Sequence, residues 1–116
     1  MRMLPLLCMF PCLLGVAVCG EVSDAKSAAG RIGEKVVIEE TVREVVIKES
    51  GTVFLNIGAA YPDEVLAVVV MKDTRPRFPG IESWKGKKVR VEGIVSDHEG
   101  RPRIILRERG QITLVE

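Results

Sequence analysis

From Lys35 onward the chain consists of short segments rich in valine and isoleucine, and turn-forming residues separate these segments at short intervals. Side chains branched at Cβ favour strands, and short strands with recurring turn signals are typical of a compact β-barrel or sandwich. The segment Thr52–Ile57 alternates most regularly, so that Phe54 and Asn56 share the face opposite its aliphatic side chains. The pattern therefore predicts an all-β domain.

The order of the predicted elements narrows the fold further. We expect strands at Lys35–Lys48, Thr52–Ile57, Val65–Lys72, Val89–Val95 and Arg103–Arg107, with a last extended segment at Ile112–Val115. The apolar phase of the first strand slips near Glu39 and Glu40, where we expect a bulge. Pro79–Lys85 is expected to form a short helix. Three strands, a helix and two strands predict a five-stranded OB-fold barrel with a short helix between strands 3 and 4. An SH3-like barrel is the alternative, and the helical segment favours the OB-fold.

The first 20 residues have the three-part order of a secretory signal. Arg2 precedes an apolar run from Met3 to Val18, and polar sequence begins at Glu21. A spanning helix needs about 20 apolar residues, and this run is shorter and contains two prolines. The sequence predicts a signal peptide over residues 1–20, a flexible linker over 21–33 and an OB-fold domain over 34–116.

Two kinds of signal processing fit the end of this segment. Ordinary cleavage before Glu21 is one of them. The other is a lipoprotein signal, because the run Val16–Gly20 resembles a lipobox in which Cys19 is diacylated and attaches the chain to a membrane. Both predict an exported protein, either periplasmic or lipid-anchored in the cell envelope.

Composition argues against catalysis. The three cysteines all lie in the first 20 residues, and the single histidine is His98, in a predicted turn. A histidine-rich metal site cannot be assembled from one histidine without cysteines in the folded domain, and that domain has no thiol nucleophile. We therefore expect no enzyme activity, no metal and no cofactor.

Charge is divided unevenly along the chain. The formal net charge is +1, but residues 20–70 carry 5 basic and 9 acidic side chains, whereas residues 71–116 carry 11 and 7. The second half is a candidate basic surface, although such asymmetry also arises from two solvated faces.

Several motifs resemble a known family. They are Gly51–Gly58 (GTVFLNIG), Tyr61-Pro62, Trp84–Ile94 (WKGKKVRVEGI), Gly100–Leu106 (GRPRIIL) and Gln111-Ile112. Together they resemble a bacterial OB-fold family often described as nucleic-acid-binding, stand-alone and exported, and also found attached to exported nucleases. The resemblance covers nearly the whole predicted barrel and implies an OB fold with a role in handling nucleic acid.

Single-stranded nucleic acid needs aromatic rings for stacking and cations for its phosphates. The candidate nucleic-acid-binding residues are Phe54, Asn56, Tyr61, Lys72, Arg75, Arg77, Arg101 and Arg103. Phe54 either faces outward or plugs the barrel, and Tyr61 either stacks on a ligand or caps the barrel. The expected function is an exported module that binds single-stranded DNA or RNA without sequence preference. The alternative is a cell-envelope protein that binds a protein or a small ligand and has no nucleic-acid role.

Overall fold

The computed structural model describes residues 22–115 of the chain. The signal segment expected at residues 1–20, with the candidate lipidation site Cys19, lies outside the described residues. The elements are α2 (Ala25–Ala29), β2 (Lys35–Ile47), β3 (Val53–Ile57), β4 (Leu66–Val70), η2 (Lys72–Arg77), η3 (Ile81–Ser83), β5 (Lys88–His98), β6 (Arg101–Leu106), η4 (Arg109–Gln111) and β7 (Ile112–Leu114). Within residues 22–115, no helix has the length and apolar character needed to cross a membrane.

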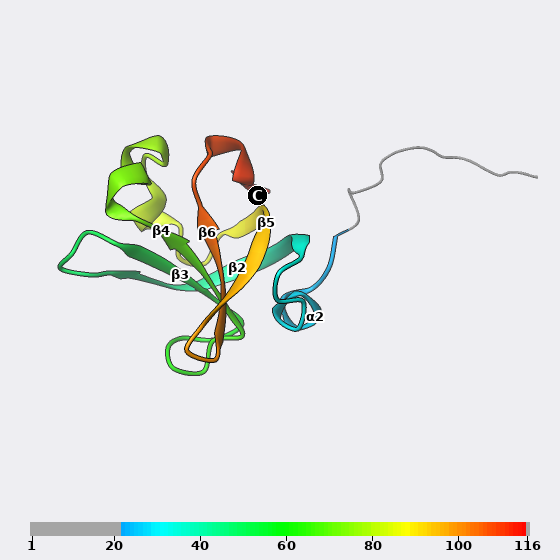
Figure 1. Ribbon diagram of the computed structural model, residues 1–116. Coiled ribbons are helices and arrows are strands. Elements are labelled where there is room, and N and C mark those ends of the chain that lie inside the picture. Colours follow the sequence, from blue (N-terminus) through cyan, green and yellow to red (C-terminus); the bar gives the residue numbers. More distant parts are fainter. Residues whose placement is uncertain (1–21, 116) are drawn as a thin grey trace, which may run out of the picture.

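The strands close into a barrel (Figure 1). The sheet order is β2-β3-β4-β6-β5-β7, and β2 also pairs with β5. The β4–β6 pair is parallel, whereas the other pairs are antiparallel. This order, with a connection between the third and fourth barrel strands, is the five-stranded OB-fold, which confirms the predicted fold class.

The long strand β2 closes the barrel because it serves two partners. Residues 35–41 pair with β5, and residues 42–47 pair with β3. The register shifts between Val42 and Glu44, so the expected bulge at Glu39 and Glu40 was misplaced. The charged residue Glu40 stands in this apolar strand for another reason. Its carboxylate accepts a hydrogen bond of 2.9 Å from the Ala25 backbone N–H, in the first turn of α2.

The segment expected to be a flexible linker is folded onto the barrel over its described part. Helix α2 buries Ala25 and Ala28, and Asp24 caps its N-terminus by accepting from the Ser27 N–H at 2.7 Å. Ser23 forms a parallel bridge with Ile38, in the part of β2 that does not pair with β3. Small alanine side chains let this short helix lie close to the core, which the polar composition of the segment concealed.

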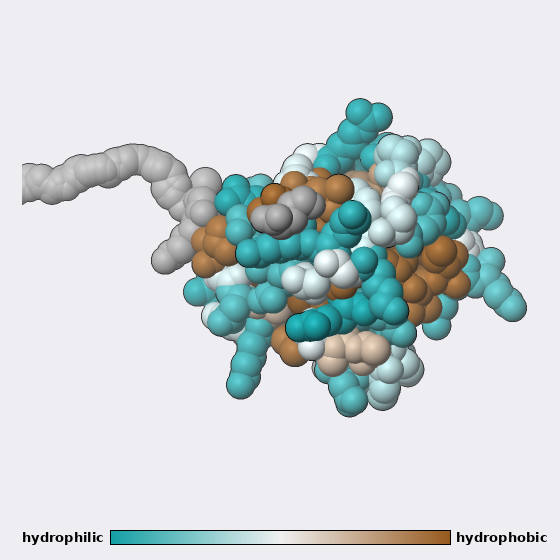
Figure 2. Space-filling model, turned by 180° about the vertical axis from the view of Figure 1, so that it is seen from behind, coloured by the Kyte–Doolittle hydropathy of each residue, from teal (hydrophilic) through white to brown (hydrophobic). Residues whose placement is uncertain are grey.

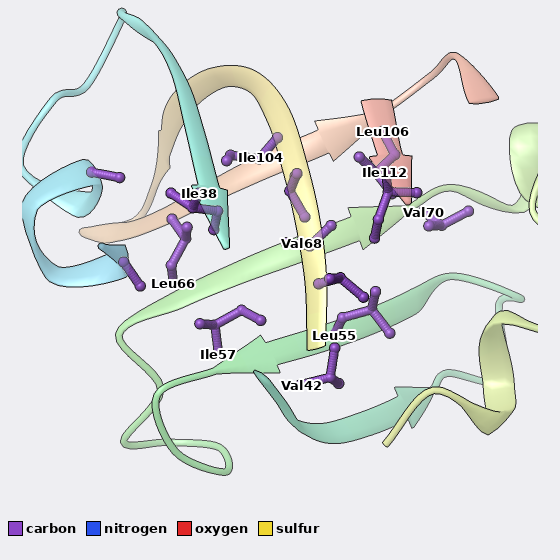
Figure 3. Close-up of a cluster of buried hydrophobic side chains, with 14 of the residues drawn as sticks. Ile38, Val42, Leu55, Ile57, Leu66, Val68, Val70, Ile104, Leu106 and Ile112 are labelled. Atoms are coloured by element: carbon purple, nitrogen blue, oxygen red, sulfur yellow. The ribbon is translucent and has the colours of Figure 1, made fainter. Parts of the chain in front are cut away.

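The interior of the barrel is mostly aliphatic (Figure 3). The inward side chains of β3 are Val53, Leu55 and Ile57, all fully buried as the alternation predicted. Strand β4 is buried on both faces, as expected for a central strand. The burial of apolar surface contributes about 25 cal/mol per Å² and is the main favourable contribution to the stability of such a core.

The connection between β4 and β5 differs from the expected helix. It contains two short 3-10 turns, η2 and η3, in place of one helix over Pro79–Lys85. Pro76 and Pro79 lack backbone N–H donors, and Gly80 has a φ of 80°, so an α-helix cannot run through this stretch. Trp84 follows η3 and packs against the core.

The hydrophobic side chains that remain outside are dispersed. Figure 2 shows hydrophobic areas separated by hydrophilic side chains on the back of the molecule. The most exposed aliphatic residue is Ile94, which lies on β5 and is 60% exposed. Scattered apolar residues of this kind are normal on a protein surface and do not mark an interface.

Candidate functional site

Two rows of side chains cross the outer face of the barrel. One row follows the pairs Glu44–Asn56, Asn56–Ala67, Ala67–Arg103 and Arg103–Ser96. The bulge in β2 makes this possible, because it brings Glu44 into phase with the outward residues of β3. The polar row therefore runs from β2 across the sheet to β5.

The second row lies beside the first and is more apolar. It follows the pairs Val46–Phe54, Phe54–Val69 and Val69–Ile105. Phe54 is thus outside the barrel, which settles the choice between an outward ring and a barrel plug. Parts of both rows line one hollow with a volume of about 430 Å³. The loops at its lower end, β3–β4 and β5–β6, lie next to each other (Figure 1).

Two cations lie near the Phe54 ring. The Lys48 Nζ is 5.7 Å from the ring centroid, and the Arg103 Cζ is 5.4 Å from it. Both distances are within the range of cation–π attraction. Burial lowers the pKa of the Arg103 guanidinium, and the nearby Glu99 carboxylate opposes that shift. Arg103 is therefore a partly desolvated cation at the centre of the face.

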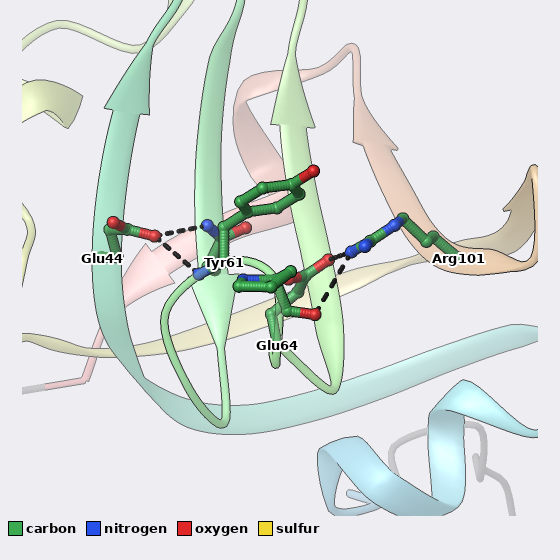
Figure 4. A network of polar contacts seen from close by, with 6 residues as sticks. Glu44, Tyr61, Glu64 and Arg101 are labelled. Carbon is green, nitrogen blue, oxygen red and sulfur yellow. Dashed lines mark hydrogen bonds and ion pairs between the residues drawn. The ribbon is translucent and has the colours of Figure 1, made fainter.

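A carboxylate fixes the loop that carries Tyr61 (Figure 4). The Glu44 Oε1 accepts from the Tyr61 backbone N–H at 2.9 Å and from the Asn56 Nδ2 at 2.8 Å. The bond from the Tyr61 N–H, followed by that from Asn56, holds the pKa of Glu44 below its ordinary value. Asn56 is 3% exposed, so its amide positions Glu44 more than it meets solvent.

A second carboxylate holds the same loop from the other side. The Arg101 Nη1 donates to the Glu64 Oε2 at 2.6 Å, and this ion pair joins the β3–β4 loop to β6 (Figure 4). The Arg101 guanidinium also lies over the Tyr61 ring, 4.9 Å from its centroid. Tyr61 is 65% exposed and does not cap the barrel. Its ring is held in position and open to solvent.

Five of the predicted binding residues line this hollow, namely Phe54, Asn56, Tyr61, Arg101 and Arg103. The other three, Lys72, Arg75 and Arg77, do not. They belong to η2, which follows the end of β4 distant from the β3–β4 loop (Figure 1). Arg75 pairs with Glu82 at 3.0 Å, and the Arg77 Nη1 donates to the Arg107 carbonyl at 2.7 Å.

Sequence reasoning missed several residues that line the hollow, among them the charged residues Glu44, Lys48 and Glu64. The regular alternation after the bulge, with Val45 and Ile47 facing the other way, is the signal that could have put Glu44 and Lys48 on the outer face with Phe54. The partners of Glu64 come from β6, and no pattern in the sequence links them. Within residues 22–115, no group of histidine, cysteine or acidic side chains is arranged to hold a metal ion.

A second hollow, of about 590 Å³, lies beside β5, β6 and η4. Several of its polar groups are engaged with the protein itself. Lys35 pairs with Glu92 at 3.0 Å, and the Gln111 amide donates to the Glu92 carbonyl at 3.1 Å. None of the predicted binding residues lines it. The hollow around Phe54 is therefore the stronger candidate site.

Comparison with known proteins supports the fold. No protein-family model matches the chain, and no curated protein matches it. Among solved structures, OBody AM1L10 bound to hen egg-white lysozyme matches with a TM-score of 0.58 and 14% identity, over 76% of this chain and 84% of that one.

Aminoacyl-tRNA synthetases match as well. Aspartyl-tRNA synthetase from Entamoeba histolytica has a TM-score of 0.60 and 18% identity, over 83% of this chain and 21% of that one. Asparaginyl-tRNA synthetase from Pyrococcus horikoshii has a TM-score of 0.50 and 20% identity, over 76% and 21%. The chain spans about a fifth of the length of these synthetases. At these identities the likeness is one of fold, and the chain shares the OB barrel with these proteins.

Proposed function

We propose that this protein is an exported OB-fold module that binds single-stranded nucleic acid across the outer face of β2, β3, β4 and β6. The main observation behind this proposal is a hollow that is lined by the Phe54 ring and by two cations near that ring, Lys48 and Arg103. Bases stack on aromatic rings, and cations track the backbone, in proteins that bind single strands. The face formed by the second and third barrel strands is also where OB-folds bind oligonucleotides. The structural likeness to synthetases that by name act on tRNA supports the same class of ligand.

The charges around the hollow predict modest, salt-sensitive affinity. Arg101 is paired with Glu64, whereas Lys48 and Arg103 form no ion pair with any residue from 22 to 115. Two free cations contact about two phosphates, which gives a slope of about −1.4 for log K against log salt concentration on a single strand. Glu44 and Glu99 also line the hollow and limit its positive potential.

Fluorescence anisotropy of a labelled single-stranded oligonucleotide tests the proposal. We expect binding at low ionic strength that weakens as salt is added, with a slope of about −1.4. The double variant with Lys48→Gln and Arg103→Gln should lower both the affinity and the slope. The matched control, Arg107→Gln with Arg109→Gln, removes the same charge from exposed positions outside the hollow and should change the slope little. No binding at low salt would refute the proposal.

A protein ligand is the second candidate, and the balanced charge around the hollow favours it. The OBody that binds hen egg-white lysozyme has the same fold and supports this class of partner. In this case the protein acts in the cell envelope and has no nucleic-acid role. Failure of oligonucleotide binding, together with a cross-linked protein complex that Phe54→Ala abolishes, would favour this candidate over the first.

Export is part of the proposal and rests on the sequence of residues 1–20, where Cys19 is the candidate lipidation and membrane-attachment site. Mass spectrometry of the mature N-terminus distinguishes the two kinds of processing. A diacylated Cys19 shows a lipid-anchored protein, a free N-terminus at Glu21 shows ordinary cleavage, and an intact Met1 refutes export.

A further inference from the structure

Two buried polar atoms without partners lie in the same hollow. In the described part of the chain, the buried side-chain nitrogen and oxygen atoms that make no hydrogen bond are the Glu64 Oε1 and the Arg103 Nε. Both residues line the hollow around Phe54. The Glu64 side chain is only 7% exposed, and its other oxygen is engaged by Arg101. Of these two orphan atoms, as we call them, the Glu64 Oε1 is an acceptor and the Arg103 Nε carries a donor N–H.

Buried polar groups normally have hydrogen-bond partners, so a pair of orphans in one hollow indicates what a ligand supplies. A ligand that fits must donate an N–H or O–H to Glu64 and offer an acceptor to Arg103. The sugar-phosphate backbone of DNA has acceptors only, and a carboxylate repels its phosphates. In a DNA ligand, the group that meets Glu64 is therefore the edge of a base.

Bases differ in how well they donate to a recessed carboxylate oxygen. The exocyclic amino group of cytosine or adenine projects from the ring and carries two N–H donors. In uracil and thymine the remaining donor is the ring N3–H, which is flanked by two carbonyl oxygens that a carboxylate repels. The neighbouring Arg103 can donate its Nε–H to a ring nitrogen or carbonyl of the same base, while its terminal N–H groups remain for a phosphate.

We propose that the hollow selects a base that carries an exocyclic amino group, through Glu64 as acceptor and Arg103 as donor, over uracil or thymine. This inference rests on the proposed function and sharpens it. The sequence led us to expect binding without sequence preference, and the two orphan atoms assign a preference to one base position. The aromatic rings of Phe54 and Tyr61 supply stacking that does not depend on the base.

The test compares two ligands that differ in little else. Oligodeoxycytidine and oligodeoxyuridine of about a dozen nucleotides, the length that one OB fold can cover, are both pyrimidine strands and differ at the exocyclic group and N3. Anisotropy is measured at slightly alkaline pH, where cytosine is not protonated. We expect the cytidine strand to bind at least about five-fold more tightly, the lower end for one base contact.

Two variants locate the preference. Glu64→Gln leaves the amide oxygen to Arg101 and turns an NH2 donor toward the ligand in place of the unpaired Oε1, so the affinity ratio should fall close to one. Glu49→Gln removes the same charge from an exposed residue outside the hollow and should leave the ratio unchanged. The melting temperature of each variant shows whether it remains folded.

Equal affinity of the wild-type protein for the two strands would overturn the base preference and leave the proposed function intact. A ratio that Glu64→Gln does not change would also overturn it. Failure of both strands to bind any of the proteins would refute the proposed function together with this inference.

Discussion

Phe54 is an aromatic residue on the outer surface of a barrel whose interior is mostly aliphatic. Its ring adds little to the core, and two cations lie near it. Exposed aromatic rings beside cations are what single-stranded nucleic acid requires. At the scale of single residues, the proposed binding therefore depends on this ring more than on any other group.

Replacing the ring should weaken binding while the fold is kept. Phe54→Leu retains an apolar side chain on the strand but removes the stacking surface. We expect a loss of about 1–3 kcal/mol, or roughly 5- to 150-fold in Kd for a single-stranded oligonucleotide, by anisotropy. Ile94→Ala, which trims an exposed aliphatic side chain outside the hollow, is the control and should change Kd little. Unchanged affinity of Phe54→Leu would exclude stacking on this ring.

The Tyr61 loop should respond to acid through Glu44. The pKa of Glu44 is lowered in the folded protein, so its contribution to loop order is present above the ordinary value of 4.5. That contribution is lost as the pH falls through the lowered pKa. The amide resonance of Tyr61, followed by NMR, should titrate with a midpoint below 4.5, and Glu44→Gln should abolish the titration. A midpoint at or above 4.5 would show that the bond from the Tyr61 N–H is not made.

Only closure of the barrel shows that the face of Phe54 and Asn56 is the outer one. That the two residues share one face could be predicted, because side chains alternate along β3. The ion pair of Glu64 with Arg101 could not, because 37 residues separate the partners and only barrel closure brings them together. Long-range contacts of this kind leave no local pattern in a single sequence.

Strand β2 determines the site at the scale of the elements. Its bulge between Val42 and Glu44 lets one strand pair with β5 and then with β3. The same bulge turns Glu44, Val46 and Lys48 toward the hollow. The sequence placed the irregularity at Glu39 and Glu40, because a charged pair in an apolar strand resembles a phase shift. The docking of α2 on Glu40 explains that pair instead.

Deleting Arg43 should therefore be far more harmful than mutating it. The side chain of Arg43 is exposed, so Arg43→Ala should change the free energy of unfolding by less than about 0.5 kcal/mol. Deletion makes β2 a regular strand, in which Glu44 and Lys48 still face outward. It also removes the bend at which β2 passes from β5 to β3, so it should lower the free energy of unfolding by roughly 1–3 kcal/mol. Urea unfolding monitored by Trp84 fluorescence measures both. Equal stability of the two variants would contradict the role given to the bulge.

At the scale of the whole molecule, a closed barrel of five strands carries the hollow around Phe54 on its outer face. The number and order of the strands could be predicted, because valine and isoleucine runs and turn residues mark each strand locally. The 3-10 turns of η2 could not, since prolines at 76 and 79 are compatible with several irregular conformations. For that reason Lys72, Arg75 and Arg77 were grouped with the site by proximity in sequence, although they lie at the other end of β4.

The most direct test of the central claim is a map of backbone amide shifts during titration with a single-stranded oligonucleotide. We predict that the largest changes fall on residues of the hollow, at Lys48, Phe54, Tyr61 and Arg103, and that η2 changes little. Shifts concentrated on η2, or the absence of shifts at low salt, would contradict the account.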